Sequence, residues 1–179
     1  MAVRPGDAWF LAGLLSSFPN ITESGSAVLC DSRASGNGDS VPGCKVFQAP
    51  STDSTEARQI QGDEMTSYNG VALRDQVLVF RYRDKVHAVD NKCPHSAYPL
   101  VNGTPFDIED FGVVLSAGIS CPKHGWSFDL FTGTADRNNY QLQRWEVQLR
   151  PVDENHITEA MKDGLPDQEV WIRRKQRMG

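Results

Sequence analysis

The chain has 179 residues, of which 39% are hydrophobic and 23% charged, so it can build a sizeable core and needs no disulfide framework to stay folded. Its formal net charge of −5 argues against nucleic acid or an anionic membrane as the main partner, and it favours a basic protein partner. With 15 glycines, 10 prolines and many β-branched residues, strands and turns are favoured over helices, and we expect an all-β fold.

The first apolar stretch is "AWFLAGLLSSF", from Ala8 to Phe18. It has about half of the roughly 20 apolar residues that a helix needs to cross a membrane, so we predict no membrane insertion. A signal peptide is the alternative, but Asp7 lies directly before the stretch and no clear small-residue cleavage site follows it. We expect a first strand, or a junction of strand and helix, at this position.

The segment from Thr22 to Arg58 is rich in Ser, Gly, Asp, Thr and Pro and shows little periodicity. We predict a long, partly disordered surface insertion over residues 22–58. Cys30 and Cys44 lie inside it and are expected to be mobile, exposed free thiols. Four cysteines are too few for a disulfide scaffold, which points to a reducing compartment and hence to a cytoplasmic protein.

The rest of the chain shows alternating strand patterns between turn residues. "QVLVFRYR" at residues 76–83 has a period of two, and after a turn "VHAVDN" at residues 86–91 predicts the returning strand of a hairpin. Further strands are predicted at residues 112–120, 126–131, 144–150 and 169–174. A short helix is predicted within residues 154–168, and the basic tail that begins at Arg173 is expected to fray.

Two loops each pair a cysteine with a histidine. "CPHSAYPL" carries Cys93 and His95, and "CPKHGWSFDLFTG" carries Cys121 and His124. Thiolates and imidazoles suit zinc or iron-sulfur centres better than magnesium or calcium. A zinc finger takes its two cysteines from one segment and its two histidines from another, whereas each loop here supplies one of each. Two irons bridged by sulfides account for this pairing, and a single zinc ion held by the same four residues remains the alternative.

These loops resemble those of the Rieske proteins, whose signature is Cys-x-His in one loop and Cys-x-x-His in a second. The similarity continues past His124 through "GWSFDLFTG" and covers about Gln76 to Gly133 closely. "DIEDFG" at residues 107–112 resembles the soluble, eukaryotic type of Rieske ferredoxin found in animals.

The resemblance implies a Rieske-like fold of antiparallel sheets, with residues 1–179 as a single domain and a cluster-binding subdomain at about residues 90–136. It also implies a 2Fe-2S cluster as the cofactor. In this arrangement Cys93 and Cys121 bind one iron, and His95 and His124 bind the other.

An electron-transfer function follows from the same resemblance. Rieske proteins of membrane complexes carry an extra cysteine in each loop, which this chain lacks, and after Gly133 too few residues follow to build a complete oxygenase. We therefore expect a soluble one-electron carrier between a reductase and an oxygenase or similar acceptor. The alternatives are a Rieske-fold enzyme or enzyme subunit, such as a small subunit like that of nitrite reductase, and a zinc-stabilised binding module. His87 and His156 have no neighbouring cysteine and are predicted not to be ligands.

Overall fold

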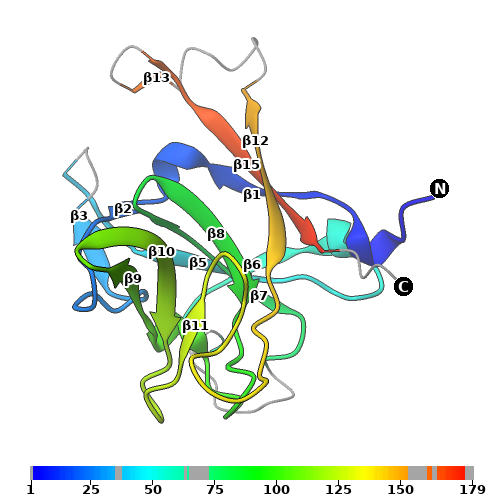
Figure 1. Cartoon of the computed structure of the whole chain (residues 1–179). Helices are drawn as coiled ribbons and strands as arrows, with labels where there is room; N and C mark the ends of the chain where they lie inside the picture. The colour runs from blue at the N-terminus through cyan, green and yellow to red at the C-terminus, as the bar shows by residue number, and fades with distance from the viewer. Residues whose placement is uncertain are drawn as a thin grey trace.

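The computed structural model describes residues 2–34, 38–62, 64, 73–152, 161–162 and 165–175, with the backbone alone at 161–162 and 165–166. The elements that it bounds within these residues are strands and short 3₁₀ helices, so the all-β prediction is confirmed. The strands form several sheets stacked around a central one (Figure 1).

The five-stranded sheet contains β2 (Asn20–Ile21), β5 (Cys44–Gln48), β6 (Arg58–Ile60), β7 (Gln76–Tyr82) and β8 (Lys85–Asp90). One three-stranded sheet contains β1 (Phe10–Leu14), β12 (Trp145–Pro151) and β15 (Gln168–Arg174), and the other contains β9 (Thr104–Asp110), β10 (Val113–Ser120) and β11 (Ser127–Asp129). Two small hairpins are formed by β3 (Ser32–Ala34) with β4 (Ser40–Pro42), and by β13 (Met161–Lys162) with β14 (Leu165–Pro166). The 3₁₀ helices are η1 (Pro5–Asp7), η2 (Leu15–Ser17), η3 (Ser54–Glu56) and η4 (Leu100–Asn102).

The central strand β7 pairs antiparallel with β5 and β8 and parallel with β2. Leu78 and Phe80 face one hydrophobic core, and Val77 and Val79 face a second core on the opposite side of the sheet. Successive side chains of a strand point to opposite faces. In β7 both faces are buried, so the alternating side chains enter two different cores and neither set faces solvent.

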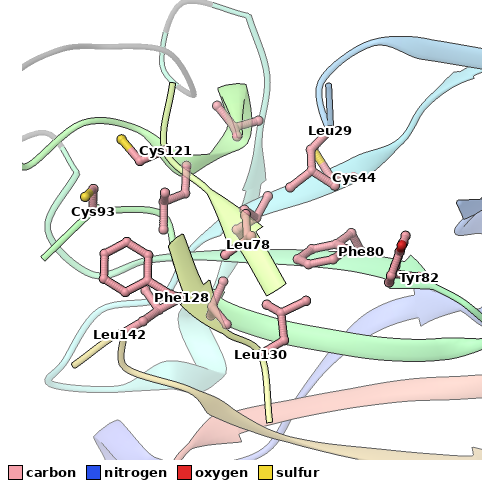
Figure 2. Packing of buried hydrophobic residues seen from close by; sticks show 14 of the residues in the cluster. Leu29, Cys44, Leu78, Phe80, Tyr82, Cys93, Cys121, Phe128, Leu130 and Leu142 are labelled. Atoms are coloured by element: carbon pink, nitrogen blue, oxygen red, sulfur yellow. The ribbon is translucent and has the colours of Figure 1, made fainter. Parts of the chain in front are cut away.

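The first core lies between the five-stranded sheet and the β9–β10–β11 sheet, and it reaches the two Cys-His loops. Figure 2 shows Leu78 close to Phe128 and Leu130, with Cys93 and Cys121 at one end of the same cluster. The second core packs β1, β12 and β15 against the other face of the central sheet. The loops are therefore attached directly to the most buried part of the molecule.

Most predicted strands are confirmed. The stretch that begins at Ala8 forms β1 followed by η2, β7 and β8 form the predicted hairpin, and β12 pairs antiparallel with β15. The strand predicted at residues 126–131 is shorter and ends at Asp129. None of the helices in the described part of the chain is long and apolar enough to cross a membrane.

The prediction of a loosely structured insertion over residues 22–58 is wrong where the structure describes it. This segment contains β3 to β5, η3 and the start of β6, and β5 pairs with the central strand β7. Cys44 is only 3% exposed, so it is not a mobile surface thiol. The prediction used the average composition of the segment, which is polar. It therefore missed the five-residue strand β5, whose burial depends on pairing with β7, a strand distant in the sequence.

The helix predicted within residues 154–168 also differs from the structure. Met161–Lys162 and Leu165–Pro166 pair as the antiparallel strands β13 and β14, and residues 153–160, 163 and 164 lie outside the described part. Residues 152–167 join β12 to β15, and these two strands pair antiparallel. β13 and β14 therefore extend the hairpin that β12 and β15 form. The tail at residues 176–179 also lies outside the description.

Candidate metal centre

The two Cys-His loops follow strands of the first core. Residues 93–98 come shortly after the end of β8, and residues 121–126 join β10 to β11. β10 and β11 are hydrogen-bonded neighbours, so the second loop closes a hairpin whose ends are fixed by the sheet. Both loops therefore begin at positions that the core holds in place.

The backbone folds in the same way in both loops, although the Cys–His spacing differs. Cys93 donates its amide to the carbonyl of Tyr98 (2.8 Å), and Ala97 donates to the carbonyl of Cys93 (2.8 Å). In the second loop, Cys121 donates to Trp126 (2.7 Å) and Gly125 donates to Cys121 (3.0 Å). The two cysteines thus occupy equivalent positions in two equivalent turns.

The two thiols are buried and interact with each other. Cys93 is 0% exposed and Cys121 is 1% exposed. A side-chain hydrogen bond between them, followed by contacts from Ser96 and from the amides of Ser96 and His95, lowers the pKa of Cys93 to about 5. The same pairing raises the pKa of Cys121. The lowered pKa of Cys93 favours its thiolate, the form that binds metals.

His95 is positioned by an aromatic neighbour. Its ring stacks on Trp126 at a centroid distance of 3.9 Å and an interplanar angle of 7°, and it meets His124 edge-on at 5.1 Å. Nδ1 of His95 is buried and has no hydrogen-bond partner among the described residues. A buried imidazole nitrogen without a partner is unfavourable unless a ligand binds there. His124, in contrast, is exposed to solvent.

The donor set fits a two-iron centre better than a single ion. Within the described part of the chain, no three His, Cys, Asp or Glu side chains are grouped so that they could hold one metal ion. A single zinc ion would need all four loop side chains around one point. In a cluster of two irons bridged by two sulfides, each iron takes only two protein ligands. One thiol pair and one imidazole pair are therefore enough to bind both irons.

A third segment covers the two loops, and the sequence did not indicate its role. Tyr140 meets the ring of His95 edge-on at 5.6 Å and that of Trp126 at 5.2 Å, and the Arg137 guanidinium lies 5.3 Å from the Trp126 ring. The amide of Ala135 donates to the carbonyl of Tyr140 (3.2 Å), which folds this segment back on itself. No sequence signal identifies these residues, because their contacts depend on the path of a loop.

The other candidate residues do not belong to either Cys-His loop. Cys44 is in β5, where burial raises its pKa to about 12, and Cys30 is half-buried with its thiol 3.5 Å from the Asn102 side-chain oxygen. His87 is buried in β8 between the rings of Phe80 and Phe131. His156 lies outside the described residues.

The Rieske [2Fe-2S] domain family matches residues 52–147, which is more than half of the chain and contains both loops. The chain belongs to the Rieske [2Fe-2S] domain family. Its cofactor is accordingly a Rieske-type 2Fe-2S cluster, and its class of chemistry is electron transfer. The two buried thiols, and the His95 nitrogen that has no hydrogen-bond partner among the described residues, are consistent with this cofactor.

Three solved structures are similar to this Rieske protein. The first, described as an NADH-dependent nitrite reductase small subunit from Mycobacterium tuberculosis, has 15% identity and a TM-score of 0.48, with 96% of this chain and 98% of that chain covered. A nitrite reductase small subunit described with NADPH has 24% identity and a TM-score of 0.37, covering 54% and 74%. The Sphingomonas yanoikuyae B1 ferredoxin has 25% identity and a TM-score of 0.33, covering 57% and 76%. A search of curated proteins finds no match.

Proposed function

We propose that Cys93 and Cys121 bind one iron of the 2Fe-2S cluster, that His95 and His124 bind the other, and that the protein transfers single electrons through this centre. The observation that carries the proposal is the pair of equivalent turns, which bring two buried thiols and two neighbouring imidazoles together at one end of the first core. When bound, the cluster supplies the change of oxidation state.

The residues of this chain hold and expose that centre. The paired thiols are shielded from solvent, and the Trp126 ring fixes the plane of His95. His124 is exposed and lies next to His95, so it gives the electron a short route to a docked partner. We further propose that residues 1–179 act as one domain, since both cores pack on opposite faces of the same central sheet.

The ligand assignment can be tested by purifying the protein without oxygen, measuring iron and acid-labile sulfide, and recording the EPR spectrum of the reduced form. The wild type should contain two irons and two sulfides per chain. His124→Ala should abolish the Rieske-type spectrum, whereas His156→Gln, which changes a histidine outside both loops, should keep it. An unchanged spectrum in His124→Ala contradicts the assignment, and a colourless protein with stoichiometric zinc contradicts the function.

The partners that we propose are a reductase as electron donor and an oxygenase-like protein as acceptor, or the larger subunit of one oxidoreductase. A specific feature favours the second arrangement. The β9–β10 hairpin ends in apolar side chains that face solvent: Phe111 is 100% exposed, and Val113, Val114 and Leu115 are 60%, 55% and 66% exposed. A freely diffusing carrier gains nothing from such a patch, whereas a resident subunit can bury it against its partner.

This alternative makes a distinct prediction for the protein purified from its own cells. If the hairpin contacts a larger redox subunit, that subunit should co-purify in a fixed ratio, and Leu115→Lys should release it. Leu149→Lys is the matched control, because Leu149 is an exposed leucine (43%) on β12, outside the hairpin. A chain that purifies alone, with reduction by a separate reductase unaffected by Leu115→Lys, supports the free carrier instead.

A further inference from the structure

The charges of this protein are distributed unevenly. The three segments that build the candidate metal centre, residues 91–98, 121–128 and 134–142, contain the basic residues Lys92, Lys123 and Arg137 and a single acidic residue, Asp136. Their formal charge is therefore 3 − 1 = +2, while the whole chain carries −5. The remaining residues then carry −5 − 2 = −7. The metal centre thus lies in a basic part of an acidic protein.

These positive groups are neighbours of the candidate ligands, in sequence or by contact. Lys92 directly precedes Cys93, Lys123 lies between Cys121 and His124, and both lysines are exposed. Arg137, whose side chain is 53% exposed, lies over the Trp126 ring that stacks on His95. The three loops lie together at the lower end of the molecule in Figure 1, away from the β7–β8 turn.

The centre of this basic face is aromatic and accessible. Tyr140 is 39% exposed and contacts the His95 ring, and His124 is exposed beside it. Asp136, the one acidic residue of these three segments, forms an ion pair with Arg137 at 3.3 Å. A partner docking here meets aromatic groups in the middle and positive charge around them.

We propose that this face, comprising Lys92, Lys123, Arg137, His124 and Tyr140, is the electron-exchange surface, and that it fits a protein partner whose contact surface carries aspartate and glutamate side chains. The inference rests on the proposed function. It reverses the expectation from net charge, which favours a basic partner, because charges near the contact outweigh distant ones screened over about 8–10 Å. A second copy does not fit, since two like-charged faces repel, and the −7 of the remaining residues disfavours nucleic acid.

The proposal can be tested with two small oxidants of opposite charge, each of which takes one electron from the reduced cluster. Ferricyanide is an anion and is reduced to ferrocyanide, and tris(phenanthroline)cobalt(III) is a cation and is reduced to cobalt(II). If the exit face is basic, raising the salt concentration from low to physiological should slow oxidation by ferricyanide, by up to roughly tenfold, and speed oxidation by the cobalt complex. A protein of charge −5 without a basic face should show the opposite signs.

A matched pair of double variants locates the effect. Lys92→Gln with Arg137→Gln removes two positive charges beside the cluster and should abolish most of the salt dependence with ferricyanide. Arg4→Gln with Arg83→Gln removes the same charge elsewhere: Arg4 precedes η1, and Arg83 lies in the β7–β8 turn, about 20 Å along β8 from the first loop. This control should leave the salt dependence unchanged.

The outcomes separate this proposal from the function on which it rests. If the protein has no Rieske EPR signal, the proposed function is refuted, and the exchange surface that rests on it is refuted as well. If the signal is present but ferricyanide oxidation speeds up with salt, or both double variants behave alike, the basic exchange surface is refuted while the electron-transfer function stands.

Discussion

Ala97 occupies in the first loop the backbone position that Gly125 occupies in the second. Both lie four residues after a cysteine and donate their amide to its carbonyl, and both have a left-handed conformation, with φ of 55° and 71°. An L-residue with a Cβ is strained there by about 1–2 kcal/mol, while glycine is not. Alanine therefore stores strain in the first Cys-His loop.

This comparison predicts opposite effects for two exchanges of a single methyl group. Ala97→Gly should raise the free energy of unfolding by about 0.5–1 kcal/mol, since the relief of strain exceeds the added backbone entropy of the unfolded chain. Gly125→Ala should lower it by about 1–2 kcal/mol through conformation alone, because no heavy atom lies within 4 Å of the added Cβ. The urea concentration at which half of the cluster absorbance is lost measures both. A lower midpoint for Ala97→Gly would show that its conformation is not strained.

The candidate ligands could be predicted from sequence because cysteine and histidine are rare and occur here at ligand spacing. The residues around them could not. Tyr140 contacts His95 from 45 residues away in sequence, and no motif marks it. Its position depends on the path of the segment that follows β11, which is a property of the packed structure.

At the scale of elements, β8 was predicted as the returning strand of a hairpin, but the environment of its histidine was not predicted. His87 lies between the rings of Phe80 and Phe131 at 5.6 and 5.4 Å, and its Nε2 is buried without a hydrogen-bond partner among the described residues. Burial, with Lys85 as a smaller contribution, lowers its pKa from 6.5 to about 4. Both faces of β8 are buried. The sequence pattern of this strand therefore does not show whether the His87 side chain is buried or exposed.

The lowered pKa of His87 predicts a loss of stability in acid. Between pH 6.5 and 4 the unfolded chain binds a proton on His87 that the folded protein excludes, so the contribution is complete above pH 6.5 and is lost as pH falls towards 4. The loss approaches about 3 kcal/mol. His87→Phe should flatten the dependence on pH, because a phenylalanine ring has a similar shape and does not titrate.

Urea unfolding followed by circular dichroism at pH 7 and pH 5 measures this dependence. Acid also acts on the metal centre, so the relevant quantity is the difference in slope between wild type and variant. His156→Gln is the control and should keep the wild-type slope. Parallel slopes for wild type and His87→Phe would mean that His87 is protonated equally in the folded and unfolded states.

At the scale of the whole molecule, Arg174 at the end of β15 connects parts that are distant in the chain. Its guanidinium donates to the carbonyls of Gly6 (3.0 Å), Ala49 and Pro50 (3.2 Å), and it forms an ion pair with Asp75 at 3.1 Å. It also lies over the Trp145 ring at 4.5 Å. The strand was predicted from "EVWIRR", but two adjacent arginines do not reveal which of them points inward.

Arg174→Met should therefore destabilise the whole fold. The loss leaves three carbonyls and the Asp75 carboxylate without this donor in a partly buried site, at a cost of about 2–4 kcal/mol. Arg173→Met is the matched control on the same strand; its main polar partner is Glu146, in a single partly buried ion pair, so its loss should cost less than the loss of the four polar contacts of Arg174. Thermal unfolding should show one cooperative transition at a lower temperature for Arg174→Met, because this residue joins the N-terminal segment to both the central sheet and the β1–β15–β12 sheet. If instead the two variants unfold at the same temperature, Arg174 is a surface residue in energetic terms, and hydrophobic packing alone holds the sheets together.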